Sequence, residues 1–322
     1  MPSPNVVVLA ESLEASLPTA STRDIAASAS AARLVGCHVY EMPADFEHCG
    51  TAENALCHIS VQKTATAAFW LGFIPSPERY AAIEKAARAK NLVLCNTLEQ
   101  HLDAQEFDRF YPKLGEMTPR SVIIRHPDEA AAALKAVGGG PVFVKGVIQS
   151  RKSRGWRACV AETIGELEIL VRHLLDLENR SRGRVVVRQL VPLRYTRTAP
   201  GSDFPLGREF RLFLLYGQIV ALGYYWEGED NLSALTPAEE VTVRSMAEEA
   251  ASRVGTPYIA VDIGQAETGE WIVIETGDAQ FSGLSCMSAL LLWRRVSDQV
   301  SQRVDNRQAG TWDAIKKRSK AA

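Results

Sequence analysis

The 322-residue chain is long enough for two or three subdomains, and its 46% apolar residues can form a buried core. Its 36 Lys and Arg residues nearly cancel its 38 Asp and Glu residues, which argues against binding to DNA or to membranes through overall charge. No apolar run approaches the roughly 20 residues of a membrane helix, so we expect no membrane partner. The first ten residues lack the pattern of a signal peptide, and six scattered cysteines without a Cys-x-x-Cys pair suit reduced thiols. We therefore expect a cytoplasmic protein.

Residues 1–116 alternate short apolar runs with Ala-rich helical stretches, which is typical of an open α/β sheet. The elements expected here are strands at Val6–Leu9, His38–Met42 and Leu92–Cys95, and helices at Thr22–Val35 and Glu78–Lys90. No Gly-x-Gly-x-x-Gly motif accompanies them, so we predict no dinucleotide site. Two prolines, Pro112 and Pro119, flank a polar connector, and we place a domain boundary near residue 116.

Residues 117–192 are expected to form a small α+β subdomain. Its predicted elements are strands at Ser121–Ile124, Val142–Lys145, Arg157–Ala161 and Arg184–Gln189, and helices at Pro127–Val137 and Ile164–Glu178. We expect the glycines at 138–140 to end the first of these helices. We do not interpret them as a phosphate-binding P-loop, because the segment lacks the Lys-Ser/Thr of that motif. A basic loop, Ser150–Trp156, connects the second and third strands.

Residues 193–305 read as hairpins and helices, and residues 306–322 as a tail. The predicted elements are strands at Glu209–Tyr216 and Ile219–Trp226, a helix at Pro237–Val254, strands at Tyr258–Ile263 and Glu270–Thr276, and a last helix at Ser285–Val304. Gly217-Gln218 is expected to form the first turn, since a type II′ hairpin places Gly first.

Two acids of the second hairpin are candidate metal ligands. If Gln265 pairs with Glu270, Asp262 lies opposite Val273, and Glu275 is its diagonal neighbour on the same face. Mg²⁺ bound to nucleotide phosphates is commonly held by one or two carboxylates. Asp278 supplies a further carboxylate just beyond. The alternative is a hairpin whose acids are simply solvated.

Three cations lie where they could meet phosphate groups. Lys145 and Arg188 end apolar strands, and Arg211 lies within one. A charge in a buried strand is costly unless it is paired. Phosphate oxygens would serve as partners, and internal salt bridges are the alternative.

The order of the motifs resembles the ATP-grasp superfamily, and more narrowly its clade named for two arginines and a lysine. The motifs that carry the resemblance are Thr118-Pro119-Arg120-Ser121, Val144-Lys145-Gly146 with Ser150-Arg151-Lys152, Val187-Arg188-Gln189-Leu190-Val191-Pro192, Glu209-Phe210-Arg211-Leu212-Phe213, Val261-Asp262-Ile263 and Ile274-Glu275-Thr276-Gly277-Asp278. They span about half of the chain. The resemblance implies an α+β ATP-grasp fold, in which two α+β subdomains (117–192 and 193–305) grip ATP after an N-terminal α/β region.

The resemblance also implies roles for individual residues. Lys145 would hold the α- and β-phosphates, Arg211 would meet the γ-phosphate, and Arg188 would be one of the two arginines, so these three would be the catalytic cations. The backbone of Gln189, Leu190 and Val191 would pair with adenine, and Lys152 would lie in a loop covering the phosphates. Asp262, Glu275 and Asp278 would bind Mg²⁺. Gly277 departs from the pattern, because many ATP-grasp enzymes have an Asn there.

The function implied is an ATP-dependent carboxylate-amine ligase that uses ATP and Mg²⁺. A small-molecule or peptide carboxylate would form an acyl phosphate, and an amine would displace phosphate from it. One alternative is phosphoryl or nucleotidyl transfer to nucleic-acid ends held by the basic residues between Arg180 and Arg197. Another alternative is a nucleotide-binding protein without catalytic activity.

Overall fold

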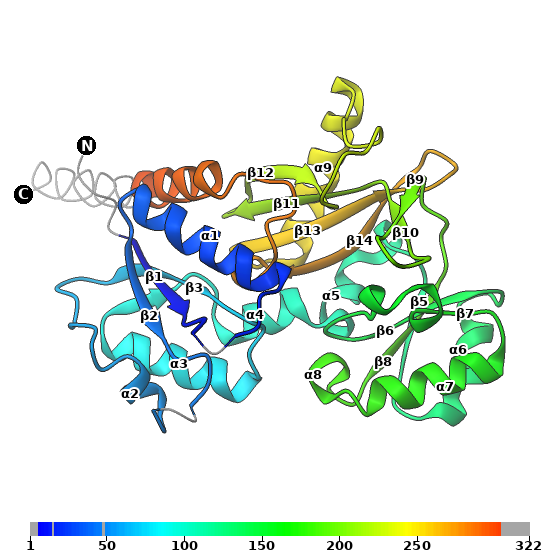
Figure 1. Cartoon of the computed structure of the whole chain (residues 1–322), viewed down its shortest axis with the longest axis horizontal. Coiled ribbons are helices and arrows are strands. Elements are labelled where there is room, and N and C mark those ends of the chain that lie inside the picture. Colours follow the sequence, from blue (N-terminus) through cyan, green and yellow to red (C-terminus); the bar gives the residue numbers. More distant parts are fainter. Residues whose placement is uncertain (1–5, 15, 47–48, 304–322) are drawn as a thin grey trace, which may run out of the picture. The chain divides into compact units, whose positions relative to one another are not determined.

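The computed structural model describes residues 6–14, 16–46 and 49–303. They form two compact units, one from residues up to 98 together with those from 287 onward, and one from Glu99–Cys286 (Figure 1). The division falls after residue 98 and not near 116, because residues 99–116 pack with the second unit. Tyr111, for example, accepts a hydrogen bond from the Ser121 backbone N–H at 2.9 Å. The predicted tail, 306–322, lies outside the described residues.

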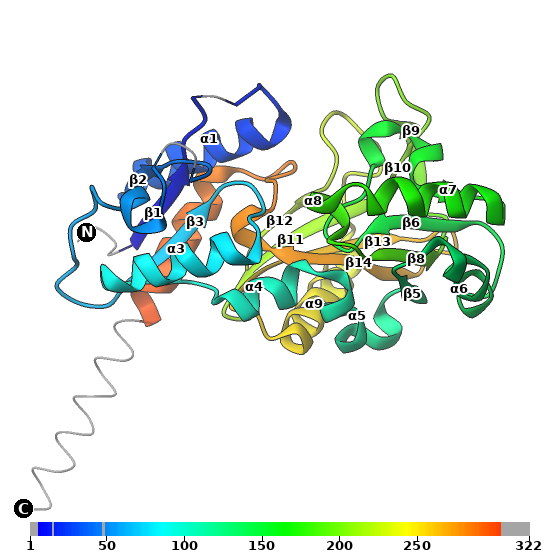
Figure 2. The ribbon, with the colours of Figure 1, turned by 90° about the horizontal axis from the view of Figure 1, so that it is seen from below.

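The first unit contains a four-stranded parallel sheet in the order β2-β1-β3-β4. Its elements are β1 (Val6–Glu11), α1 (Ala20–Leu34), β2 (His38–Met42), α2 (Ala52–Ala55), β3 (Thr66–Leu71), α3 (Pro77–Ala89) and β4 (Leu92–Leu94). Helices α1 and α3 cover opposite faces of the sheet (Figure 2). All six residues of β1 are buried, as expected for an inner strand of a parallel sheet. Strand β3 is absent from the sequence predictions because its alanines weaken the strand pattern.

The last described helix, residues 289–303, belongs to this first unit. It begins four residues later than predicted. Leu292 and Trp293 are buried, and Trp293 packs edge-on against Phe69 at 5.7 Å between ring centroids. Leu290 and Leu291 are exposed.

The second unit begins with α4 (Leu98–Gln105) and α5 (Phe107–Leu114) and continues into a small antiparallel sheet, β5-β8-β6-β7. The elements of this part are β5 (Ser121–Ile124), α6 (Ala130–Ala136), β6 (Val142–Gly146), β7 (Val160–Ala161), α7 (Ile164–Leu175), α8 (Glu178–Ser181) and β8 (Val185–Gln189). Helices α6 and α7 pack on it through a core of aliphatic side chains that includes Val142, Leu167 and Val187. Thr163 caps α7, accepting a hydrogen bond from the Glu166 N–H at 3.3 Å.

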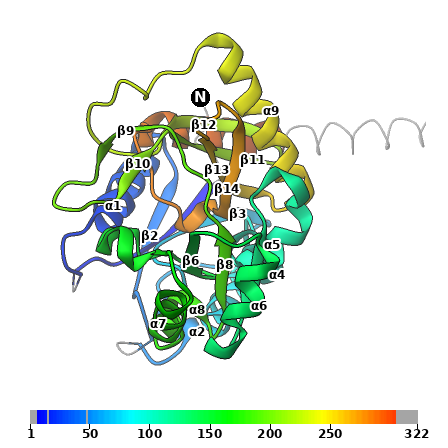
Figure 3. The same cartoon turned by 90° about the vertical axis from the view of Figure 1, so that its right-hand side faces the viewer.

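A larger antiparallel sheet, β12-β11-β13-β14, completes the second unit. Its elements are β11 (Glu209–Leu215), β12 (Gln218–Tyr224), α9 (Pro237–Val254), β13 (Tyr258–Gln265) and β14 (Trp271–Asp278). Helix α9 runs along one face of this sheet (Figure 3). Strands β9 (Tyr195–Thr198) and β10 (Pro205–Gly207) form a separate two-stranded ribbon. Among the residues described, no helix combines the length and the apolar character that crossing a bilayer requires.

The predicted turn of the first hairpin is wrong by one residue. Leu215 pairs with Gln218, so Tyr216 and Gly217 form the turn. Both have positive φ, at 51° and 79°, as a type I′ turn requires. The sequence favoured Gly first, but the structure places Tyr216 in the left-handed conformation instead.

The predicted register of the second hairpin is also wrong. Gln265 pairs with Trp271, and a β-bulge between Asp262 and Ile263 shifts the pairing by one more residue. Asp262 therefore lies directly opposite Glu275, and not opposite Val273. The bulge brings the two acids closer than the diagonal arrangement would.

Candidate active site

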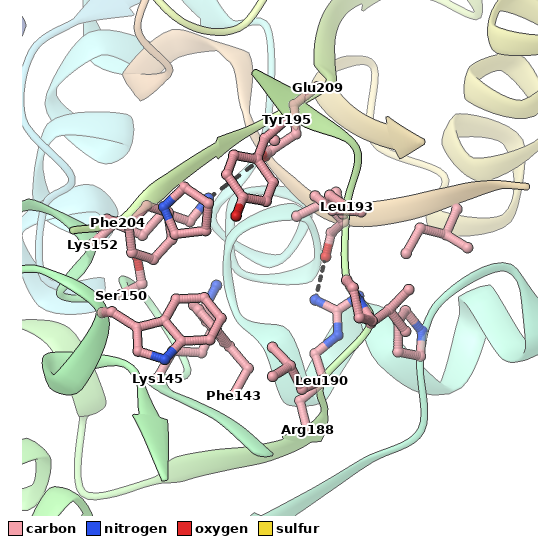
Figure 4. Close-up of a pocket in the computed structure, with 18 of the residues that line it drawn as sticks. Phe143, Lys145, Ser150, Lys152, Arg188, Leu190, Leu193, Tyr195, Phe204 and Glu209 are labelled. Carbon is pink, nitrogen blue, oxygen red and sulfur yellow. Dashed lines mark hydrogen bonds and ion pairs between the residues drawn. The ribbon is translucent and has the colours of Figure 1, made fainter. Parts of the chain in front are cut away.

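A cavity of about 350 Å³ lies in the second unit. It is lined by side chains from both sheets and from the segments that follow β6 and β8 (Figure 4). Its lining includes the predicted residues Lys145, Lys152, Arg188, Gln189, Leu190, Val191 and Glu275. Aromatic residues, among them Phe143, Trp156 and Phe204, form part of its wall. The cavity therefore combines an apolar surface with several cations.

Asp262 and Glu275 lie side by side next to this cavity, and each is paired with a predicted cation. Arg211 donates two hydrogen bonds to Asp262, both at 2.7 Å, in a bidentate arrangement. Lys145 forms an ion pair with Glu275. Burial by itself would raise the pKa of Glu275. The charges of Lys145 and Lys152 together outweigh burial and lower this pKa to about 2. Glu275 is thus an anion at neutral pH.

Glu209 is a third acid of the site, which the sequence predictions missed. Its carboxylate lies 3.6 Å from the Lys152 Nζ, and its Oε2 atom has no hydrogen-bond partner among the described residues. Burial raises the pKa of Glu209, and the negative charges of Asp262 and Glu275 act in the same direction. The signal was present in the sequence, because Glu209 lies two residues before Arg211 and therefore shares its face of β11.

Arg188 is buried in the cavity wall, and within the described part of the chain its hydrogen-bond acceptors are neutral. It donates to the Ile274 carbonyl at 2.6 Å, to the Thr118 hydroxyl at 2.7 Å and to the Val273 carbonyl at 3.1 Å. Burial lowers its pKa to about 10. The guanidinium still carries its charge at neutral pH, so this wall favours an anionic ligand.

Asp278 is not brought to the site. It lies three residues after Glu275 on β14, so its side chain points to the other face of the sheet. There it is fully buried, 2.9 Å from the His101 Nδ1 atom, and it accepts a hydrogen bond from the Gln280 N–H. Across the described part of the chain, no group of three or more Asp, Glu, His or Cys residues could hold a metal ion. A divalent cation at Asp262 and Glu275 would therefore need further oxygen ligands from a bound molecule, as Mg²⁺ commonly has.

The basic loop contributes one cation to the cavity. Lys152 points inward, whereas Arg154 is exposed. The loop is fixed to the segment before β10 by Asp203, whose carboxylate accepts a hydrogen bond from the Trp156 N–H at 2.9 Å. Lys152, the loop cation expected to cover the phosphates, thus lines the cavity.

The arginines considered for nucleic-acid binding are engaged within the protein. Arg184 pairs with Glu106 at 3.0 Å and also with Asp108. Arg180 donates to the Ser150 carbonyl at 2.6 Å, and Arg197 pairs with Asp230 at 2.9 Å. These side chains hold loops in place, so the sequence between Arg180 and Arg197 overstates the charge offered to a ligand.

Comparison of the sequence with protein families gives one match. The model of an ATP-grasp domain, family 3 of the clade named for two arginines and a lysine, matches residues 136–296. This segment is half of the chain and contains the cavity's acids and cations. No curated protein sequence matches the chain at a significant level.

Solved structures with the same fold extend over almost the whole chain. A RimK domain protein ATP-grasp from Sphaerobacter thermophilus is 15% identical, with a TM-score of 0.58 over 91% of this chain and 98% of that one. D-alanyl-alanine synthetase A from Vibrio cholerae is 13% identical, with a TM-score of 0.59 over 94% of this chain and 100% of that one. D-alanine–D-alanine ligase from Bacillus anthracis, solved with ATP, is 11% identical, with a TM-score of 0.59 over 94% and 99%. At these identities the likeness shows the fold.

Proposed function

The chain belongs to family 3 of the ATP-grasp clade named for two arginines and a lysine, and from this we propose that it is an ATP-dependent ligase that joins a carboxylate to an amine. The proposed reaction passes through an acyl phosphate, from which the amine displaces phosphate. Two observations outside the site support it: the family match, and a fold shared with proteins whose names describe ligases and synthetases, one of them solved with ATP.

The observation that carries the proposal is a cluster of three acid–cation pairs beside one cavity. Lys145 with Glu275, Arg211 with Asp262 and Lys152 with Glu209 neutralise one another in the absence of ligand. Binding of an anionic phosphate chain together with a cation would give every member a new partner of opposite charge. A site that served only to stabilise the fold would gain nothing from gathering six charges beside a cavity, because their desolvation is costly.

The donor set fits ATP and Mg²⁺. Asp262 and Glu275 would hold the metal ion, which supplies charge neutralisation at the phosphates when it is bound. Lys145, Lys152 and Arg188 face the cavity, where they would bind phosphate oxygens. Glu209 Oε2, which lies 3.6 Å from the Lys152 Nζ and accepts no hydrogen bond among the described residues, would accept one from a hydroxyl group of the nucleotide. Gln189, Leu190 and Val191 would lie along the base, with Phe143 as part of the apolar wall.

In this proposal the protein accelerates the reaction by positioning and by electrostatic stabilisation. Phosphoryl transfer leaves little covalent chemistry for side chains, so a nucleophilic residue is not required. Arg211, held by both oxygens of Asp262, has a fixed orientation from which it can stabilise developing negative charge. The substrates are a small-molecule or peptide carboxylate and an amine.

The first test is calorimetric titration with a non-hydrolysable ATP analogue, with and without Mg²⁺. We expect Mg²⁺-dependent binding in the wild type and loss of the Mg²⁺ dependence in Glu275→Gln, which keeps the size of the side chain and removes its charge. Glu270→Gln is the matched control, since Glu270 is an exposed acid of the same hairpin. Absence of binding under every condition would contradict the proposal.

The second test separates ligation from binding. Mixtures of carboxylates and amines are screened for release of ADP that requires both components. ADP release that requires a carboxylate and an amine supports a ligase. Tight Mg²⁺-dependent binding with no turnover on any pair would instead favour a nucleotide-binding protein.

A further inference from the structure

Two aromatic residues that follow β12 contact cations from two different parts of the chain. The Arg211 guanidinium lies 4.6 Å from the centroid of the Tyr225 ring, and the Lys152 ammonium lies 5.3 Å from the same centroid. Lys152 is also 5.4 Å from the Trp226 ring. The Tyr225 and Trp226 rings themselves meet edge to face at 4.7 Å. Tyr225 thus contacts both Arg211, on strand β11, and Lys152, on the loop.

Tyr225 is fixed in this place by its own backbone. Its N–H donates to the Glu209 carbonyl at 2.9 Å, which continues the pairing of β12 with β11. Glu209 in turn is the acid that pairs with Lys152. The Lys152 side chain therefore contacts three residues: Glu209, Tyr225 and Trp226. Because Lys152 belongs to the loop at 150–156, these contacts attach that loop to the larger sheet.

An aromatic ring attracts cations through the negative potential of its face, and this attraction is strongest where water is excluded. Here Lys152 and Arg211 are each paired with an acid, Glu209 and Asp262, and both cations are needed at the same cavity in the proposed function. The Tyr225 ring contacts both cations and carries no negative charge, so it holds them together without adding a competitor for a phosphate. A further carboxylate in the same place would compete with a phosphate for them.

We propose that Tyr225 is a positioning residue, which uses the face of its ring to hold Arg211 and Lys152 in place for an anionic ligand and keeps the loop at 150–156 over the cavity. The use of this arrangement for a nucleotide rests on the proposed function. The positioning of the loop does not.

Limited trypsin digestion tests the positioning directly. The bond after Arg154 lies in the exposed part of the loop, and its cleavage requires the loop to open. We expect Tyr225→Leu to speed this cleavage roughly tenfold, because the loss of one desolvated cation–π contact makes the open loop more populated by about that factor. Tyr225→Phe keeps the ring, so its cleavage rate should stay within about twofold of the wild type. Cleavage after Arg88, in α3 of the other unit, serves as the internal control and should not change. Equal rates after Arg154 in wild type and Tyr225→Leu would overturn the proposal.

Replacement of Tyr225 by pentafluorophenylalanine keeps the shape of the ring and reverses its quadrupole, so it remains informative even if Tyr225→Leu does not fold. We expect faster cleavage after Arg154 than in Tyr225→Phe, and a melting temperature close to that of Tyr225→Phe. Equal cleavage rates in the two variants would show that the ring acts through its shape alone, and the proposal would fail.

Nucleotide binding by the same variants connects the inference to the proposed function. We expect Tyr225→Leu to weaken binding of the ATP analogue roughly tenfold or more, and Tyr225→Phe to retain it. If the wild type binds no nucleotide while cleavage still responds to the fluorinated ring, the proposed function fails and the positioning of Lys152 stands. If nucleotide binds well and cleavage does not respond to the fluorinated ring, the positioning of Lys152 by Tyr225 fails and the proposed function stands.

Discussion

The ion pair between Lys145 and Glu275 contributes to the stability of the fold and, in our proposal, to nucleotide binding. Mutation can separate these two contributions. Glu275 keeps its charge because Lys145 and Lys152 lie close to it in a region shielded from water. Removing one member of a buried pair leaves the other uncompensated, which typically costs about 3–5 kcal/mol.

We therefore expect Lys145→Met to lower the free energy of unfolding by about 3 kcal/mol, because Glu275, whose side chain is 25% exposed, loses its nearest cation. The double variant Lys145→Met/Glu275→Gln should recover most of that loss, since both charges are gone. Denaturant unfolding measures this recovery. Nucleotide binding should stay weak in both variants, and normal binding in the double variant would remove Lys145 and Glu275 from the proposed site.

Among individual residues, the sequence predictions identified seven residues of the cavity wall and missed Glu209. Lys145 and Arg188 could be predicted because a charge at the end of a buried apolar strand requires a partner. Asp278 was predicted from its nearness to Glu275 in sequence, but an odd spacing along a strand separates side chains onto opposite faces. The same rule applied to Glu209 and Arg211, two residues apart, would have placed Glu209 in the site.

Among the secondary-structure elements, the end of β6 lies against the single turn of helix α8, at Arg180 and Ser181. A Cβ atom on Gly146 would lie 2.1 Å from the Arg180 carbonyl oxygen and 2.5 Å from the carbonyl carbon. These are backbone atoms, and the same oxygen accepts hydrogen bonds from the Ile148 and Gln149 N–H groups. Gly146 thus allows the strand that carries Lys145 to pack closely against this turn.

We expect Gly146→Ala to lower the free energy of unfolding by about 2–3 kcal/mol, because the backbone contact cannot relax without breaking these hydrogen bonds. Gly165→Ala is the matched control. Gly165 lies in the first turn of α7 with nothing within 4 Å of an added Cβ, so this change should be neutral or stabilise by up to about 1 kcal/mol. Denaturant unfolding of both variants checks the pair, and equal effects would contradict the packing argument.

Across the molecule as a whole, acids outside the candidate active site have pKa values that are shifted in opposite directions in the two units. Burial raises the pKa of Glu11, in the first unit, to about 7, against the opposing effects of the Phe73 N–H and Arg79. In the second unit, hydrogen bonds from Arg208 lower the pKa of Glu239 to about 2. The pKa of Asp230 is also lowered to about 2, because its hydrogen bonds outweigh the effect of burial.

These shifts predict opposite responses of the two units to pH. A raised pKa means that the folded first unit binds the proton more tightly than the unfolded chain, so its stability should fall as pH rises from about 4.5 to 7. A lowered pKa means that the contributions of Asp230 and Glu239 are complete above about pH 4.5 and are lost as pH falls toward 2. Hydrogen exchange followed by mass spectrometry at several pH values measures each unit separately.

Glu11→Gln should flatten the response of the first unit between about pH 5 and 7 and leave the second unit unchanged. Glu14→Gln is the control, because Glu14 is an exposed acid of the same region. If the first unit is equally stable at both ends of that range in the wild type, Glu11 is ionised in the folded state throughout it, and the prediction is wrong.

The α+β class, most of the strands and helices, the family and the types of residue in the site could all be obtained from the sequence. These features follow from local periodicity and from motifs whose order along the chain is fixed. Which charges meet could be learned only from the folded chain. The bulge that sets Asp262 opposite Glu275, the burial of Asp278 beside His101 and the internal pairing of the arginines from Arg180 to Arg197 all depend on partners far away in sequence. Pairing energies between such distant groups depend on distance and burial, which a linear pattern of residues does not contain.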